Sequence, residues 1–116
     1  MDKLEHIFSL QAAFDQELAR RRGLDYDFST WVQKEALAIM VELGELVDEV
    51  NYKWWKNPRP VEARAVQEEL VDILHFLISL CLKAGLSAEG LYQAYLEKNQ
   101  ENFRRQEGTS SKEGYV

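Results

Sequence analysis

The chain has 116 residues, 46% of them hydrophobic and 29% charged, which is typical of one globular domain with its own core. Its formal net charge of −6 argues against a protein that binds nucleic-acid polymers or anionic membrane surfaces non-specifically. The single cysteine, Cys81, excludes a disulfide within the chain, and we expect it to be a buried thiol in a reducing compartment.

The N-terminus has no apolar stretch of the kind found in signal peptides. The apolar run from Ile73 to Leu82 is too short to span a bilayer. We therefore expect a cytoplasmic protein without a membrane partner.

The first predicted helix runs from Asp2 to Arg22 and ends at Gly23. Gln11 lies within its apolar stripe, where it is either a boundary residue or a polar group with a function. The apolar residues recur at roughly helical spacing, as Leu4, Ile7, Phe8, Phe14 and Leu18.

The second predicted helix begins after an N-cap at Ser29 or Thr30 and runs to Asn51 or Trp54. Glu42, Glu45 and Glu49 share one arc at the border of its apolar stripe. The predicted core positions of this helix are Val32, Ala36, Ile39, Leu43, Leu46, Val47 and Val50.

Residues 52–60 break the helical pattern, because Pro58 and Pro60 stand within three residues of each other. Trp54 lies here between Lys53 and Trp55. The rings could stack on a base while the lysines meet phosphates, or the tryptophans could cover the hydrophobic core with the lysines in water.

The third predicted helix runs from near Val61, with Pro60 at its start, to Ala84-Gly85. Ser87 caps a fourth helix that runs to Arg105. No strand pattern competes, so we predict an all-α, four-helix bundle-like domain over residues 1–106, followed by a mobile polar tail over 107–116. The apolar third helix favours a homodimer.

Two pairs of acidic residues stand three residues apart on consecutive helices, Glu42 with Glu45 and Glu69 with Asp72. Residues three apart lie on one face of a helix, so four carboxylates can converge and repel one another. A hard cation such as Mg²⁺ or Mn²⁺ removes that repulsion. One such pair is commonly a solvated surface, but two pairs that border apolar surface favour a metal site.

The motif Glu42-Leu-Gly-Glu45 followed by Glu69-Leu-Val-Asp72 resembles the signature of the all-α nucleoside triphosphate pyrophosphohydrolases, which include the MazG-like proteins. Within that superfamily the chain is most similar to the dimeric all-α dUTPases of bacteria and phages. The similarity extends over residues 38–46, 52–55, 68–76 and 95–106.

The resemblance implies that Glu42, Glu45, Glu69 and Asp72 are ligands of Mg²⁺, with Mn²⁺ as an alternative, and that Glu42 also orients or deprotonates the attacking water. It further implies a set of residues that contact a deoxynucleoside triphosphate. Trp54 and Gln11 are expected at the uracil, His75 and Phe76 at the deoxyribose, and Lys53, Lys56, Lys98, Asn102 and Arg105 at the phosphates or the closing side of the site.

The activity implied is Mg²⁺-dependent hydrolysis of dUTP to dUMP and pyrophosphate. A first alternative is a broader pyrophosphohydrolase that removes dCTP or non-standard deoxynucleotides. A second alternative is a non-catalytic helical adaptor with structural carboxylates. The chain is shorter than the longer dimeric dUTPases, so we expect it to lack any base-recognition elements that their extra helices carry.

Overall fold

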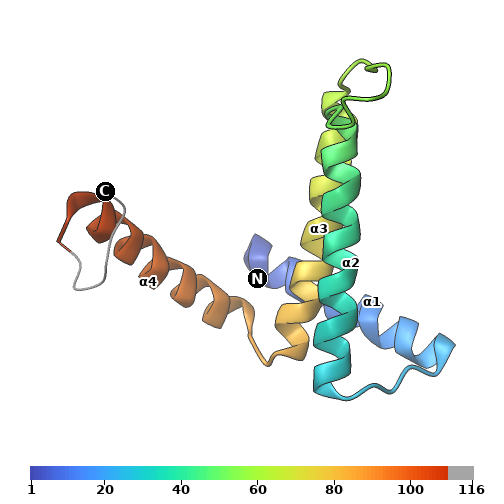
Figure 1. Ribbon diagram of the computed structural model, residues 1–116. Coiled ribbons are helices and arrows are strands. Elements are labelled where there is room, and N and C mark those ends of the chain that lie inside the picture. The colour runs from blue at the N-terminus through green and yellow to red at the C-terminus, as the bar shows by residue number, and fades with distance from the viewer. Residues whose placement is uncertain (110–116) are drawn as a thin grey trace. The chain divides into compact units, whose positions relative to one another are not determined.

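The computed structural model describes residues 1–109, and these form four α-helices with no strand among them (Figure 1). They fall into two compact units, one from Met1 to Gly85 with three of the helices and one beginning at Leu86 with the fourth. The all-α prediction is confirmed. Of the predicted tail, residues 110–116 lie outside the described part of the chain. The helices are α1 (Lys3–Arg22), α2 (Phe28–Glu49), α3 (Ala63–Lys83) and α4 (Ala88–Glu107).

The first two helices begin at aspartate N-caps. Asp2 accepts a hydrogen bond from the backbone N–H of Glu5, whose side chain accepts one from the backbone of Asp2. Asp27 caps α2 by accepting from the Thr30 backbone N–H at 2.8 Å. The predicted cap at Ser29 or Thr30 is therefore wrong. A carboxylate at the N-cap also interacts favourably with the positive end of the helix. This interaction favours Asp27 as the N-cap of α2.

The linker between α2 and α3 is longer than the sequence pattern indicates. α2 ends at Glu49, before the predicted end, because Asn51 adopts the left-handed conformation with φ of 60°. The Asn51 side chain donates to the Arg59 carbonyl at 2.7 Å and accepts from the Arg59 N–H at 2.8 Å. These two bonds close a loop over residues 51–59, and α3 starts at Ala63 instead of near Val61.

Within the first unit, α2 and α3 run side by side, and α1 packs against α3 (Figure 1). The most deeply buried side chain is that of Ile78 on α3, which is 1% exposed. Phe8 of α1 and Cys81 of α3 are buried with it, so the prediction of a buried thiol is confirmed. The core of this unit thus lies where α1 meets α3.

Much of the apolar surface of α2 and α3 stays exposed in the single chain. Leu43, Val47 and Val50 were predicted to be core residues, but all three are exposed. Leu74 and Leu77 of the apolar α3 are exposed as well. Three helices cover one another on one side only, so the remaining apolar stripes have no neighbour within this unit.

The second unit contains α4, whose N-cap is Ser87 as predicted. The Ser87 hydroxyl accepts a hydrogen bond from the Gly90 N–H at 3.0 Å. Near the end of the helix, Glu101 forms ion pairs with Arg104 and Arg105. Among the described residues no single helix is both long and apolar enough to cross a membrane, although α3 and α4 taken together reach that length and composition.

Replacing Ile78 tests the location of the core. Ile78→Ala should lower the free energy of unfolding by about 2–5 kcal/mol, because it removes a fully buried side chain and leaves a cavity. Ile78→Val is the control and should cost about 0.5–1.5 kcal/mol. Urea denaturation followed by circular dichroism measures both. Equal midpoints for Ile78→Ala and the unsubstituted chain would place the core elsewhere.

Candidate functional site

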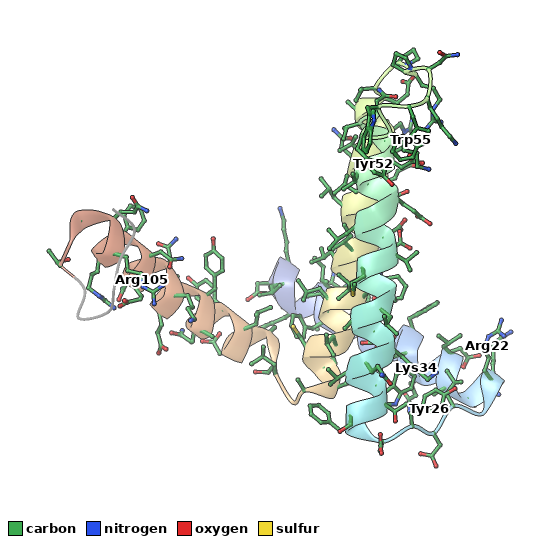
Figure 2. The ribbon with its side chains drawn as sticks, viewed as in Figure 1. Arg22, Tyr26, Lys34, Tyr52, Trp55 and Arg105 are labelled. Atoms are coloured by element: carbon green, nitrogen blue, oxygen red, sulfur yellow. The ribbon has the colours of Figure 1, made fainter. Side chains whose placement is uncertain are left out.

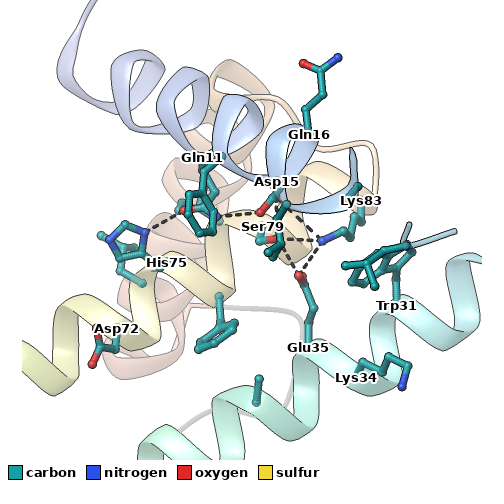
Figure 3. Close-up of a pocket in the computed structure, with 18 of the residues that line it drawn as sticks. Gln11, Asp15, Gln16, Trp31, Lys34, Glu35, Asp72, His75, Ser79 and Lys83 are labelled. Atoms are coloured by element: carbon teal, nitrogen blue, oxygen red, sulfur yellow. Dashed lines mark hydrogen bonds and ion pairs between the residues drawn. The ribbon is translucent and has the colours of Figure 1, made fainter. Parts of the chain in front are cut away.

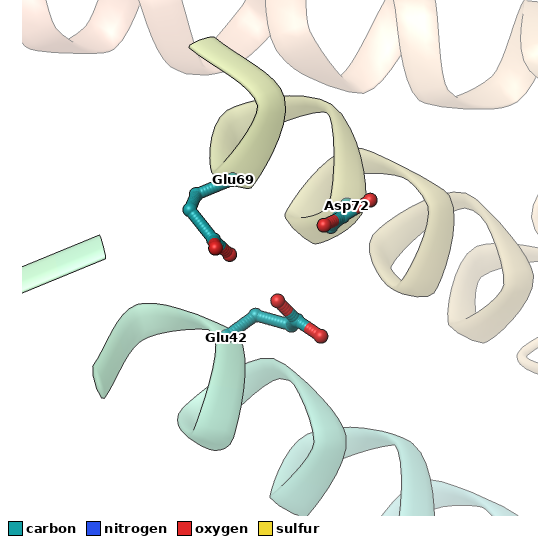
Figure 4. Close-up of side chains that lie close together, drawn as sticks. All are labelled: Glu42, Glu69 and Asp72. Carbon is teal, nitrogen blue, oxygen red and sulfur yellow. The ribbon is translucent and has the colours of Figure 1, made fainter. Parts of the chain in front are cut away.

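Three carboxylates meet between the facing surfaces of α2 and α3 (Figure 4). Glu42 comes from α2, and Glu69 and Asp72 come from α3. One oxygen from each lies within 4.8 Å of the others. The spacing of three residues places Glu69 and Asp72 on the same face of α3, so the packing of α2 against α3 brings Glu42 opposite both.

The carboxylates raise one another's pKa. The pKa of Glu42 lies above its usual value, chiefly because its carboxyl shares a hydrogen bond with that of Glu69, with desolvation adding to the shift. The pKa of Glu45 is raised mainly through its hydrogen bond with Glu42. For Glu69 the hydrogen bond with Glu42 lowers the pKa, but desolvation and the charges of Glu45 and Asp72 raise it by more. The cluster therefore carries more negative charge than the fold alone neutralises.

The donor set fits a hard divalent cation. Oε2 of Glu42 and Oε2 of Glu69 are buried and have no hydrogen-bond partner. A buried acceptor without a partner is costly, and carboxylate oxygens are the ligands that Mg²⁺ and Mn²⁺ prefer. Glu45 is more exposed and stands beside Glu42, outside the group of three. Of the predicted quartet, three members are therefore brought together and the fourth adjoins them.

A cleft of about 1000 Å³ opens between α1, α2 and α3 and reaches this cluster (Figure 3). Glu42 and Asp72 contribute to its lining at the carboxylate cluster. Its volume is of the size that small-molecule sites have. Much of the wall is apolar and includes Phe14, Leu74, Phe76 and Ile78.

Polar side chains bridge α1 and α3 along the cleft. The Gln11 side chain donates from Nε2 to Asp15 Oδ1 at 2.9 Å, and its Oε1 lies 2.8 Å from His75 Nδ1. With Gln11 in this orientation, Nδ1 of His75 is the donor. Gln11 is buried although it is polar, so the chain of bonds fixes it in place. Of the two readings of Gln11, a boundary residue or a polar group with a function, its burial in the cleft wall favours the second.

A second polar group surrounds Lys83 at the C-terminal end of α3. Its Nζ donates to Glu35 Oε1 at 2.6 Å and to Ser79 Oγ at 2.9 Å. The same Nζ lies 3.9 Å from Asp15 Oδ2 and 3.9 Å from the centre of the Trp31 ring. We call Asp15, Glu35, Ser79 and Lys83 the lysine cluster. All four of these residues line the cleft (Figure 3).

Of the predicted nucleotide contacts, Gln11, His75 and Phe76 line the cleft together with Glu42 and Asp72. Lys53, Trp54 and Lys56 do not belong to its wall. Lys53 pairs with Asp48 at 3.4 Å, and Trp54 is 84% exposed with its ring edge-on to Trp55.

We call residues 50–62, which connect α2 to α3 and carry Tyr52, Trp54 and Trp55, the aromatic linker. Within the first unit this linker lies at a distance from the lysine cluster (Figure 2). Figure 2 shows Tyr52 and Trp55 at the opposite end of the α2–α3 pair from Tyr26 and Lys34, two cleft residues. Lys98, Asn102 and Arg105 belong to α4 in the other unit. Their roles at the phosphates stay predictions.

The lysine cluster was not identified from the sequence, although Glu35 and Ser79 lie on the helix faces of the predicted metal ligands. Glu35 precedes Glu42 by seven residues on α2, and Ser79 follows Asp72 by seven on α3. Seven residues are two helical turns, so each pair shares a face. Extending the faces of Glu42 and Asp72 by two turns would have found both positions.

Known proteins resemble this chain over most of its length. A family model described as dUTPase matches residues 3–88, which include α1, α2 and α3. A dCTP pyrophosphatase of Enterobacteria phage T4 and another of Enterobacteria phage LZ5 are each 32% identical to the chain over 75 residues. Those residues are 65% of this chain and 44% of each relative, so the chain spans less than half the length of these relatives.

No solved structure matches the chain. The family model, in contrast, covers most of it, including all four predicted metal ligands and the helices that form the cleft. The chain therefore belongs to the dUTPase family.

Proposed function

We propose that this protein hydrolyses a pyrimidine deoxynucleoside triphosphate to the monophosphate and pyrophosphate, with Mg²⁺ or Mn²⁺ as cofactor. The proposal rests on the carboxylates of Glu42, Glu69 and Asp72, which meet beside a cleft of about 1000 Å³. Two of their oxygens are buried and have no hydrogen-bond partner. The match to the dUTPase family and the similarity to two phage dCTP pyrophosphatases support the same chemistry.

Each carboxylate has a role in this proposal. Glu42, Glu69 and Asp72 hold the cation, and Glu45 adds charge beside Glu42. When bound, the cation neutralises the triphosphate and stabilises the charge that develops on the leaving pyrophosphate. Glu42 also orients the attacking water and accepts its proton, since it belongs to the carboxylate cluster and also lines the cleft.

The preferred base is either uracil or cytosine. The family description favours dUTP, and the names of the phage relatives favour dCTP. Both bases offer similar aromatic faces, so stacking cannot separate them, and the choice depends on hydrogen bonds at the base edge. Gln11 and His75 are the predicted polar contacts that line the cleft.

A second copy of this chain is the proposed partner. Leu37, Met40 and Val41 form an apolar stripe on α2 whose members are all more than half exposed, and none of them lines the cleft. Such a stripe is costly in water and is covered when two copies pack helix to helix. A cytoplasmic location, where a buried thiol such as Cys81 stays reduced, belongs to the same proposal.

Glu69→Gln should lower pyrophosphate release from dUTP and dCTP at least about a hundredfold, because it removes one cation ligand while keeping the shape of the side chain. The helical signal should persist, since the change also relieves carboxylate repulsion. Glu68→Gln is the matched control, because it alters the same charge on the neighbouring, exposed residue. Pyrophosphate release with Mg²⁺ and with EDTA measures both variants. Turnover that persists in EDTA would contradict the cation requirement.

Phe76 is proposed to select the deoxy sugar, because a bulky ring beside the sugar excludes a 2′-hydroxyl. Phe76→Ala should lower the ratio of kcat/KM for dUTP over UTP by roughly tenfold. Phe8→Ala is the control, since this buried ring does not line the cleft and its loss should affect stability alone. If Phe76→Ala reduces stability and leaves the ratio unchanged, the ring is only a packing residue.

Met40→Asp should convert a dimer into single chains, because it places a charge in the middle of the proposed contact. Val61→Asp is the control, since this exposed residue lies in the linker before α3. Light scattering over a range of concentrations gives the mass of each protein. The mass of a single chain at every concentration of the unsubstituted protein would rule out the dimer.

A further inference from the structure

Glu35 has one fully engaged carboxylate oxygen and one that is buried without a partner. Oε1 accepts from Lys83 Nζ and lies 2.6 Å from Ser79 Oγ. Oε2 has no hydrogen-bond partner, although the residue is only 7% exposed and lines the cleft. A buried carboxylate oxygen that lacks a donor costs free energy, so this atom is suited to a ligand that brings an N–H group.

The lysine cluster as a whole has more acceptors than donors. Asp15 and Glu35 contribute two carboxylates, and Lys83 is the cation paired with them. Ser79 Oγ lies 2.7 Å from Asp15 Oδ2 and 2.6 Å from Glu35 Oε1, but a hydroxyl has one proton and can donate to only one of them. The cluster is therefore complementary to a ligand group that donates hydrogen bonds. It disfavours a carbonyl oxygen, which only accepts them.

The separation of Glu35 from the metal ligands matches the length of a nucleotide. Glu35 and Glu42 share one face of α2 and are separated by two turns, which is about 10 Å at the rise of an α-helix. A nucleotide spans a comparable length from its 5′ phosphate to the far edge of its base. A triphosphate at the metal ligands would thus bring its base to the lysine cluster in the same cleft.

We propose that Glu35 Oε2 accepts a hydrogen bond from the exocyclic amino group of the substrate's base, so that among pyrimidines the site selects cytosine over uracil. The inference rests on the proposed function and makes Glu35 its specificity-determining residue. Cytosine has an amino donor at the ring position where uracil has a carbonyl acceptor. A carboxylate only accepts, so uracil would face Glu35 with two unpaired acceptors.

The neighbours of Glu35 predict what a glutamine would do in its place. Lys83 donates to the Oε1 position, so the amide oxygen of Glu35→Gln must occupy it. The amide nitrogen then takes the place of Oε2 and presents a donor to the cleft. The substitution thus inverts the hydrogen-bonding character of the site with almost no change in shape.

The test is the ratio of kcat/KM for dCTP over dUTP. We expect a ratio of at least about ten for the unsubstituted protein, and a fall of roughly 10–100-fold in Glu35→Gln. Asp25→Asn is the matched control, because it removes the same charge from the cleft wall outside the lysine cluster. It should leave the ratio unchanged even if it lowers both rates. A ratio that Glu35→Gln leaves unchanged, or a preference for dUTP in the unsubstituted protein, would overturn the proposal.

Binding of dCMP and dUMP, measured by calorimetry, separates this proposal from the proposed function. If no deoxynucleotide is hydrolysed, the proposed function fails, and the two affinities still decide the role of Glu35. Tighter binding of dCMP that is lost in Glu35→Gln supports the role. Equal affinities in both proteins exclude it.

Discussion

Electrostatic repulsion between carboxylates on two packed helices is the constraint on which the rest of this structure depends. The packing of α2 against α3 brings Glu42 opposite Glu69 and Asp72, and the pKa of Glu42 rises chiefly through its hydrogen bond with Glu69. A fold that needed only stability would place apolar or oppositely charged side chains there. A ligand that brings positive charge would remove this repulsion, and a divalent cation meets that requirement.

The same two helices carry a second polar group two turns further along. Glu35 on α2 and Ser79 on α3 are related to Glu42 and Asp72 by seven residues, so both groups open into one cleft. α1 closes that cleft and contributes Asp15 and Gln11, each bonded to a partner from α3 or to the other. The carboxylate cluster and the lysine cluster thus line one cleft, because α2 and α3 run side by side over several turns.

The stacking role of Trp54 stays a prediction, because the linker that carries this residue lies outside the cleft of the single chain. Trp54 follows the first acidic pair closely in sequence, which suggested that it stacks on the base. In the structure, α2 ends at Glu49, and the Asn51–Arg59 bonds close the linker into a loop of its own. Trp54 is almost fully exposed in the single chain and does not line the cleft, whereas Trp31 contacts Lys83 within it.

The sequence by itself determined the all-α class, the helix that begins after Ser87 and the acidic residues that share a helix face, because helical periodicity and caps are local properties. Only the tertiary structure decided which faces meet. In the folded chain Leu43 and Val47 are exposed, and Glu45 lies outside the group of three carboxylates. Asp15, Glu35 and Lys83 come together from three different helices. Those contacts depend on how α1 and α2 pack on α3, and no spacing along a single helix encodes that packing.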